Sequence, residues 1–156
     1  MKLIGALTSP YVRKVLACAM MRGLADQIEK VPTMPFESPA DLVADNPLSK
    51  VPCLVTDDGL ALFDSPVICE FLDARGDALP MFPPAGPARW RALKFQAMGD
   101  GILDAAVPCR METTRPQETA RDAVIARYKS VIARTLDALE ADPPHRLVDI
   151  GSISVA

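Results

Sequence analysis

The sequence predicts a chain in two parts, an α/β domain followed by an all-α domain. Over residues 1–76, short apolar runs of strand length alternate with amphipathic stretches of helical spacing. Beyond a proline-rich segment at residues 77–88, residues 89–156 show helical spacing. We therefore expect an α/β domain over the first range, a linker over the second and a helical domain over the third.

The first domain is expected to contain four strands in one mixed sheet. Each strand is a short apolar run bounded by turn-forming residues, and the runs cover residues 2–7, 27–33, 53–56 and 60–63. The last two runs are joined by Asp57-Asp58-Gly59, which predicts a hairpin with a tight glycine turn.

Three helices are expected on the two faces of this sheet, at residues 10–22, 39–45 and 66–75. The first of them carries an apolar face made of Val12, Val15, Leu16 and Ala19. Gly23 is a natural stop for this helix.

The dipeptide Ser-Pro occurs three times, at residues 9–10, 38–39 and 65–66, each time before a helical pattern. Serine at the N-cap and proline at the first helical position are typical helix starts. The simplest interpretation is three caps. Ser9 and Ser65 also follow expected strands, so the two helix N-termini there could together offer backbone N–H groups to an anion.

The second domain is expected to hold two long helices, at residues 89–111 and 116–141. The second helix carries one apolar stripe, formed by Val124, Tyr128, Val131, Ile132, Thr135, Leu136 and Leu139. Asp142-Pro143-Pro144 ends it, His145 is expected in a surface loop, and a third helical stretch is expected from about Leu147.

Composition excludes several classes of protein. The 156 residues include 17 Lys and Arg against 20 Asp and Glu, and a net charge of −3 argues against a strongly basic nucleic-acid binder. No run reaches the roughly 18 apolar residues of a membrane helix, and the N-terminus lacks the apolar segment of a signal peptide. The four cysteines, Cys18, Cys53, Cys69 and Cys109, show no CxxC spacing, which favours buried free thiols in a reducing cytoplasm over disulfides or a zinc site.

Three segments together resemble the glutathione S-transferase family. They are Thr8-Ser9-Pro10-Tyr11-Val12-Arg13-Lys14-Val15, Asn46-Pro47-Leu48-Ser49-Lys50-Val51-Pro52 and Asp64-Ser65-Pro66-Val67-Ile68. The first segment is most similar to the bacterial, serine-type members whose first helix begins T-S-P-[FY]-V-R-K. The resemblance implies a thioredoxin-like domain followed by a helical domain, glutathione as co-substrate and no metal.

The resemblance also implies a role for each matching residue. Ser9 would donate a hydrogen bond to the glutathione sulfur and so favour the thiolate, because a thiol with a pKa of about 8.5 is mostly protonated near pH 7. Val51, before a cis Pro52, would pair with the cysteinyl backbone of glutathione. Asp64 would face the γ-glutamyl ammonium group, and Ser65 would take the α-carboxylate.

Two further residues have two interpretations each. Lys50 is either a partner of the glycyl carboxylate or a solvated loop lysine. Asp100, in the Asp100-Gly101 pair, resembles a helix residue that reaches across a dimer interface toward the partner's glutathione, which implies a homodimer. The alternative is an ordinary exposed helix Asp100 with Gly101 as a packing contact.

The sequence departs from the family in four places. Pro10 stands where some bacterial classes carry a cysteine, which argues against a cysteine-type enzyme. Glu37-Ser38 replaces a frequent basic residue near the glycyl end. The family's sixth helix opens with Ser/Thr-x-x-Asp, but here Arg146 stands three residues before Asp149. The chain also ends early, so we expect a helical domain that is incomplete at its C-terminus, with apolar surface that a dimer or aggregation would cover.

The function implied by the resemblance is conjugation of glutathione to an electrophilic, apolar substrate. Two alternatives stay open, because fold alone does not fix function. One is a glutathione-binding regulatory protein without turnover, and the other is a glutathione-dependent reductase of peroxides or disulfides.

Overall fold

The computed structural model describes residues 1–144 and 148–156, which form two compact units, Met1–Pro83 and Pro84–Ala156. The expectations for His145, Arg146 and Leu147 lie outside these described residues. No helix of the described part of the chain is long and apolar enough to cross a bilayer.

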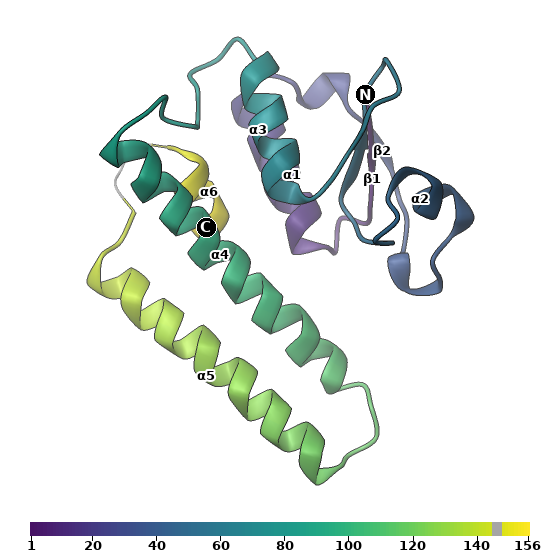
Figure 1. Ribbon diagram of the computed structural model, residues 1–156, viewed down its shortest axis with the longest axis vertical. Helices are drawn as coiled ribbons and strands as arrows, with labels where there is room; N and C mark the ends of the chain where they lie inside the picture. Colours follow the sequence, from purple (N-terminus) through teal and green to yellow (C-terminus); the bar gives the residue numbers. More distant parts are fainter. Residues whose placement is uncertain (145–147) are drawn as a thin grey trace. The chain divides into compact units, whose positions relative to one another are not determined.

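The first unit is built on a four-stranded mixed sheet, as the sequence predicted (Figure 1). The strands are β1 (Lys2–Ile4), β2 (Glu29–Val31), β3 (Cys53–Val55) and β4 (Ala61–Leu62). Their order is β2-β1-β3-β4; β1 pairs with β2 in parallel, and the other two pairings are antiparallel. β1 is shorter than its apolar run because Gly5 leaves the strand with a φ of 148°.

Helices cover both faces of this sheet. Successive strand residues point to opposite faces, and the two central strands place Ile4 opposite Cys53. Both side chains form a buried cluster with Leu42 of α2 (Ala40–Asp45). On the other side of the sheet, α1 (Pro10–Met21) packs against α3 (Ser65–Arg75), and α3 contacts β3. Figure 1 shows α2 on one side of the sheet and this helix pair on the other.

Helix α1 has the start and the stop that its sequence predicted. Ser9 is the N-cap and Pro10 the first helical residue. At the other end Gly23 takes a φ of 71°, and its N–H donates to the carbonyl of Met20 at 3.1 Å. The N–H of Leu24 donates to the carbonyl of Ala19 at 2.8 Å, which completes a Schellman motif.

The other two Ser-Pro pairs do not place serine at an N-cap, so that prediction was wrong for them. Ser38 has a φ of 47° and ends the short 3-10 helix η2 (Pro35–Glu37), while Pro39 caps α2. Ser38 is held in this conformation by the hydroxyl of Ser49, 3.0 Å away. Before α3 the cap is Asp64, so Ser65 becomes the first helical residue.

The second unit contains three helices in its described part: α4 (Pro87–Glu112), α5 (Thr119–Ala141) and α6 (Ile150–Val155). α4 packs against both α5 and α6, and α5 runs alongside α4 in Figure 1. No residue of α5 is fully buried. Within its predicted apolar stripe, Val124 and Leu136 are 40% and 47% exposed.

Two glycines let α6 lie against α4. A Cβ at Gly151 would be 2.6 Å from the carbonyl oxygen of Ala92, and a Cβ at Gly99 would collide with the carbonyl of Ser154. α6 begins with a capping box in which Asp149 is the cap: its Oδ1 accepts from the N–H of Ser152, and its own N–H donates to Oγ of Ser152, both at 2.9 Å. The aspartate therefore starts this helix.

The segment that follows α3, residues 76–82, is held in place by hydrogen bonds to a buried ion pair. The Arg22 side chain is 3% exposed, and its Nε lies 3.1 Å from Oδ1 of Asp73. Its two terminal nitrogens donate to the carbonyls of Asp73, Gly76 and Ala78. The carboxylate of Asp73 accepts the N–H groups of Met81 and Phe82, at 2.8 and 3.1 Å. Residues 76–82 are thus held against α1 and α3.

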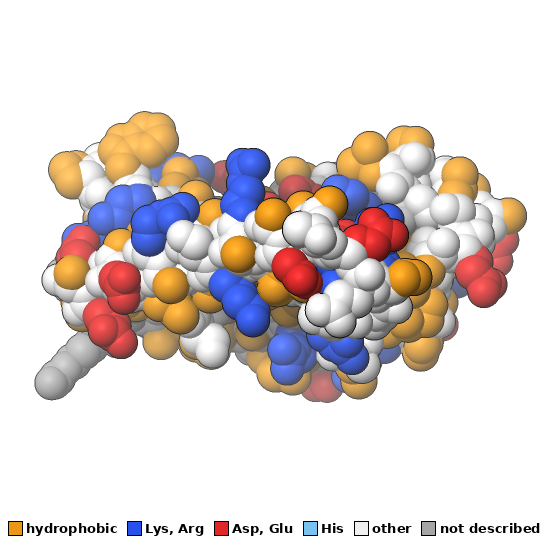
Figure 2. Space-filling model, turned by 90° about the horizontal axis from the view of Figure 1, so that it is seen from below, with side chains coloured by type: hydrophobic (Ala, Val, Ile, Leu, Met, Phe, Trp, Pro, Cys, Tyr) orange, Lys and Arg blue, Asp and Glu red, His pale blue; other side chains and the backbone are white. Residues whose placement is uncertain are grey.

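The surface carries charges of both signs. On the face seen from below in Figure 2, Lys and Arg side chains are interspersed with Asp, Glu and hydrophobic side chains. This mixture follows from the nearly equal numbers of basic and acidic residues, 17 and 20.

Candidate functional site

The predicted site residues of the first unit gather at one edge of the sheet. In the antiparallel pairs Ile4 lies opposite Cys53 and Leu54 lies opposite Leu62. The end of β1, the start of β3 and the end of β4 therefore share this edge. The segments that leave or enter these strand ends carry Ser9, Lys50, Val51, Pro52, Asp64 and Ser65.

Ser9 stands half-buried at the N-terminus of α1. Its Oγ accepts the N–H of Val12 at 3.4 Å, and its own N–H donates to the carbonyl of Ala6 at 3.0 Å. A hydroxyl has one donor and two acceptor positions, so Oγ can accept from Val12 and still donate to another group. The positive dipole end of α1 favours an anion at this position.

Val51 and Pro52 lie directly before β3, and the peptide bond between them is cis, as predicted. Pro52 is buried and Val51 is half-buried. A Cβ at Gly5 would be 3.1 Å from Cβ of Val51 and 2.6 Å from Cγ2 of Val12. Gly5 therefore gives Val51 the room to lie against the end of β1. Our sequence reasoning missed this glycine, although its place at the end of a strand was a signal.

Asp64 and Ser65 form the start of α3. Asp64 is exposed, and its carboxylate makes no hydrogen bond or ion pair with the described residues. Ser65 is 1% exposed and is the first helical residue. The Phe63–Asp64 peptide bond is also cis. The pair thus presents a carboxylate for a cation beside a helix N-terminus for an anion.

Lys50 and Asp100 lie in different units. Lys50 is exposed, and its ammonium group has no partner in the part of the chain that is described. Asp100 is half-buried on α4 in the second unit. A Cβ at the neighbouring Gly101 would meet no atom within 4 Å, so Gly101 is not a packing contact among the residues that the structure describes.

Two buried thiols, those of Cys18 and Cys53, are poorly suited to act as nucleophiles. All four cysteines are free; Cys18, Cys53 and Cys69 are buried, as expected, and Cys109 is half-buried. Burial, with a smaller effect of Asp45, raises the pKa of Cys53 to about 11. A hydrogen bond with Cys69, together with burial, raises the pKa of Cys18. Among the described residues, no group of three or more His, Cys, Asp and Glu side chains could hold a metal.

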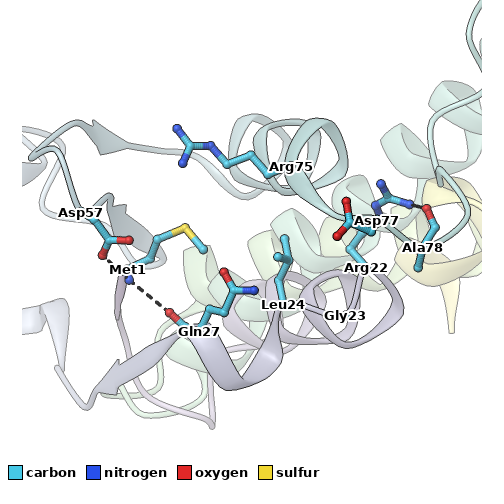
Figure 3. Close-up of a pocket in the computed structure, with 9 residues that line it drawn as sticks. All are labelled: Met1, Arg22, Gly23, Leu24, Gln27, Asp57, Arg75, Asp77 and Ala78. Atoms are coloured by element: carbon cyan, nitrogen blue, oxygen red, sulfur yellow. Dashed lines mark hydrogen bonds and ion pairs between the residues drawn. The ribbon is translucent and has the colours of Figure 1, made fainter.

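A cavity of about 480 Å³ lies at the opposite edge of the sheet (Figure 3). Met1 and Asp57, which border it, come before β1 and after β3, and the Met1 ammonium lies 2.7 Å from Oδ1 of Asp57. Arg22 donates to backbone carbonyls, and Arg75 lies over the ring of Phe71, 4.4 Å from its centroid. None of the predicted site residues lines this cavity.

Comparison with known proteins supports the resemblance found in the sequence. Residues 8–75 match the family model described as the N-terminal domain of glutathione S-transferase. Over 140 residues the chain is 36% identical to YibF of Escherichia coli K12, an uncharacterized GST-like protein; the match covers 90% of this chain and 68% of YibF.

Several solved structures are similar over 99% of this chain, two of them from Pseudomonas fluorescens Pf-5. A glutathione transferase family member from Pseudomonas fluorescens Pf-5, with bound glutathione, has a TM-score of 0.92 and 36% identity over 78% of its length. A further structure from this organism, with bound S-(propanoic acid)-glutathione, has a TM-score of 0.86 and 34% identity, again over 78% of its length. The chain belongs to the glutathione S-transferase family. Its fold is the thioredoxin-like domain and helical domain that the sequence predicted.

Proposed function

We propose that this protein binds glutathione at the sheet edge described above and conjugates its thiolate to an electrophilic, apolar substrate. One observation carries the proposal: Ser9, Val51 and the Asp64–Ser65 pair lie at one edge, beside the N-termini of α1 and α3. The similarity to a transferase family member that holds glutathione supports it.

Each end of glutathione has a complementary group at this edge. Asp64 receives the γ-glutamyl ammonium group, and Ser65, at the start of α3, receives the α-carboxylate through its hydroxyl and N–H. The backbone of Val51, before Pro52, pairs with the cysteinyl unit. Lys50 is the proposed partner of the glycyl carboxylate.

Ser9 is the proposed activating residue. Its hydroxyl, free to donate, hydrogen-bonds the glutathione sulfur more strongly when the sulfur is charged. The N-terminus of α1 acts in the same direction. The thiol pKa falls as a result, and the thiolate attacks the electrophile.

A second copy of the chain completes the proposed assembly. Asp100 on α4 reaches the partner's glutathione in a homodimer, which is the commonest oligomer. Free thiols such as Cys18, Cys53 and Cys69 fit a reducing compartment, so we place the protein in the cytoplasm.

Two assays on the purified protein test the function. Calorimetric titration with glutathione tests binding, and turnover of a chromogenic electrophile with glutathione tests conjugation. We expect both to be positive. Binding without turnover of electrophiles would favour a regulatory protein, and glutathione oxidation with peroxide or disulfide substrates would favour a reductase. Conjugation is preferred because one similar structure holds a glutathione whose sulfur carries a carbon substituent.

A further inference from the structure

Asn46 is a buried polar residue that the proposed mechanism does not use. It follows α2 in the loop that leads to Val51, and it is 1% exposed. Asparagine is rarely this buried unless its amide is fully hydrogen-bonded. Its burial therefore raises the question of what its side chain holds.

The loop after Asn46 folds around this side chain. Its Nδ2 donates to the carbonyl of Lys50 at 2.8 Å, and its Oδ1 accepts the N–H of Leu48 at 3.0 Å. Its own carbonyl accepts the N–H of Ser49 at 2.9 Å. Both polar atoms of the amide are thus bonded to main chain.

The bond to Lys50 fixes the peptide group that enters Val51. The carbonyl of Lys50 and the N–H of Val51 belong to one planar unit, so holding the oxygen sets the direction of the N–H. On its other side Val51 lies against Gly5. A Cβ atom added at Gly5 would be 3.1 Å from the Cβ of Val51. The backbone of Val51 is therefore constrained from both sides.

We propose that Asn46 is a positioning residue for glutathione, which orients the Lys50–Val51 peptide so that the backbone of Val51 meets the cysteinyl unit of the ligand. This inference rests on the proposed function. Asparagine suits the role because one rigid amide supplies both the donor for Lys50 and the acceptor for Leu48. A carboxylate at this position would turn an acceptor toward the carbonyl of Lys50.

The test uses S-methylglutathione, which lacks an ionisable thiol, so that backbone recognition is measured apart from thiol activation. Its dissociation constant is measured by calorimetry for the wild type, Asn46→Ala and Asn46→Asp, with the melting temperature of each. Ser49→Ala is the control, because it removes the contacts of Ser49 Oγ with Pro35 and Ser38 from the same loop without touching the Lys50–Val51 peptide.

We expect Asn46→Ala to weaken binding by about tenfold or more, while the pKa of bound glutathione at saturation stays at its wild-type value. Ser49→Ala should lower the melting temperature and keep the wild-type dissociation constant. Asn46→Asp should bind weakly at neutral pH and recover relative to the wild type as the pH falls, since a protonated carboxyl can again donate to Lys50.

Equal binding by the wild type and Asn46→Ala would overturn the inference and leave the proposed function standing. A loss in Ser49→Ala as large as that in Asn46→Ala would also overturn it, because loop stability alone would then explain the effect. If Asn46→Ala does not fold, Asn46→Asp decides. The inference is overturned if the affinity of Asn46→Asp, relative to that of the wild type, does not change with pH. A wild type that does not bind the ligand overturns the proposed function and this inference together.

Discussion

Ser9 joins two tasks in one side chain, since it caps α1 and is the proposed donor to the glutathione sulfur. We expect Ser9→Ala to remove a hydrogen bond to a charged group, worth about 1.5–3 kcal/mol. The apparent thiol pKa should therefore rise by about one to two units, and turnover near pH 7 should slow, with glutathione binding less affected. The pH–rate profile of kcat/KM measures this.

Thr8→Ala is the matched control, because Thr8 carries the neighbouring hydroxyl and is exposed. If Thr8→Ala loses turnover and Ser9→Ala keeps it, the activating role moves to Thr8. If neither variant changes the profile, the N–H groups at the start of α1 carry the activation alone.

Asp64→Ala should instead weaken glutathione binding at an unchanged thiol pKa, because it touches the non-reacting end of the ligand.

The Arg22–Asp73 ion pair is a buried charge pair of the first unit. Both side chains are nearly inaccessible, at 3% and 9% exposed, and Asp73 also accepts two backbone N–H groups. We expect Asp73→Ala to cost about 3–5 kcal/mol of unfolding free energy, because it leaves the Arg22 guanidinium buried without its counter-ion. Urea denaturation measures the loss.

Arg75→Ala serves as the comparison for that experiment. Arg75 is exposed and rests on the ring of Phe71. Its removal should change the unfolding free energy by about 0.5 kcal/mol or less. Equal losses for Asp73→Ala and Arg75→Ala would contradict the assignment of Arg22 and Asp73 as a structural pair.

Two glycines of helix α4, two residues apart, should respond to alanine in opposite directions. At Gly99 a Cβ collides with α6, whereas at Gly101 it meets open space. We expect Gly99→Ala to destabilise the protein by about 1–3 kcal/mol through overpacking. Gly101→Ala should stabilise a single chain by about 0.5–1 kcal/mol, because glycine weakens a helix interior. Thermal and urea denaturation of both variants decide, and a stabilised Gly99→Ala would refute the close packing of α4 and α6.

Asp142, the C-cap of α5, forms ion pairs with two residues of α4. Its carboxylate lies 2.6 Å from Nη2 of Arg91 and 3.2 Å from Nζ of Lys94. The hydrogen bonds from Arg91 and Lys94 lower the pKa of Asp142 to about 2. Since the folded state favours the ionised carboxylate, its stabilising effect is complete above the unfolded pKa of about 3.9 and is lost as the pH falls toward 2.

Asp142→Asn should therefore be less stable than the wild type at neutral pH, and the difference should shrink as the pH falls below about 4. Denaturation series at several pH values measure it. Asp137→Asn is the control, because Asp137 is exposed on α5 and has no partner among the described residues. A pH-independent difference for Asp142→Asn would show that the ion pair does not contribute.

Dimerisation of this chain can be tested with one substitution. Gly101 borders Asp100 on α4 and has open space around it in a single chain, so Gly101→Arg should leave the fold intact. We expect the wild type to sediment as a dimer at micromolar concentration and Gly101→Arg to sediment as a monomer. A monomeric wild type would refute the dimer, and a dimeric Gly101→Arg would remove this face of α4 from the interface.

Local patterns were sufficient to predict most of the architecture. Alternating apolar runs and glycine or proline boundaries predicted the four strands, and 3.6-residue spacing predicted the helices before and after the proline-rich segment. Those signals are short-range, so they do not depend on the final packing. The same holds for the cap at Ser9, which a short motif identifies, whereas the cis Val51–Pro52 bond was predicted from the family resemblance.

The contacts between distant segments could not be predicted in this way. Nothing near Arg22 in the sequence indicates that it binds carbonyls more than fifty residues away. The packing of Gly99 and Gly151 depends on how α4 and α6 meet, and the burial of Asn46 depends on the turn after it. Ser38 and Ser65 show a related limit. The Ser-Pro motif predicted each serine as an N-cap, but the cap is the neighbouring residue in both cases, Pro39 and Asp64.

The burial of the cysteines has a consequence for a protein that is proposed to work in a pool of glutathione and its disulfide. Mixed disulfides form when a thiolate attacks an accessible disulfide sulfur. Cys18 and Cys53 are buried and have raised pKa values, so both side chains are almost entirely in the protonated thiol form at neutral pH. Their thiols are thereby removed from exchange with the solvent pool, and Cys109, the half-buried thiol, is the first open to glutathionylation. The fold can use thiol chemistry on its ligand while the sulfur atoms of Cys18 and Cys53 stay out of that chemistry.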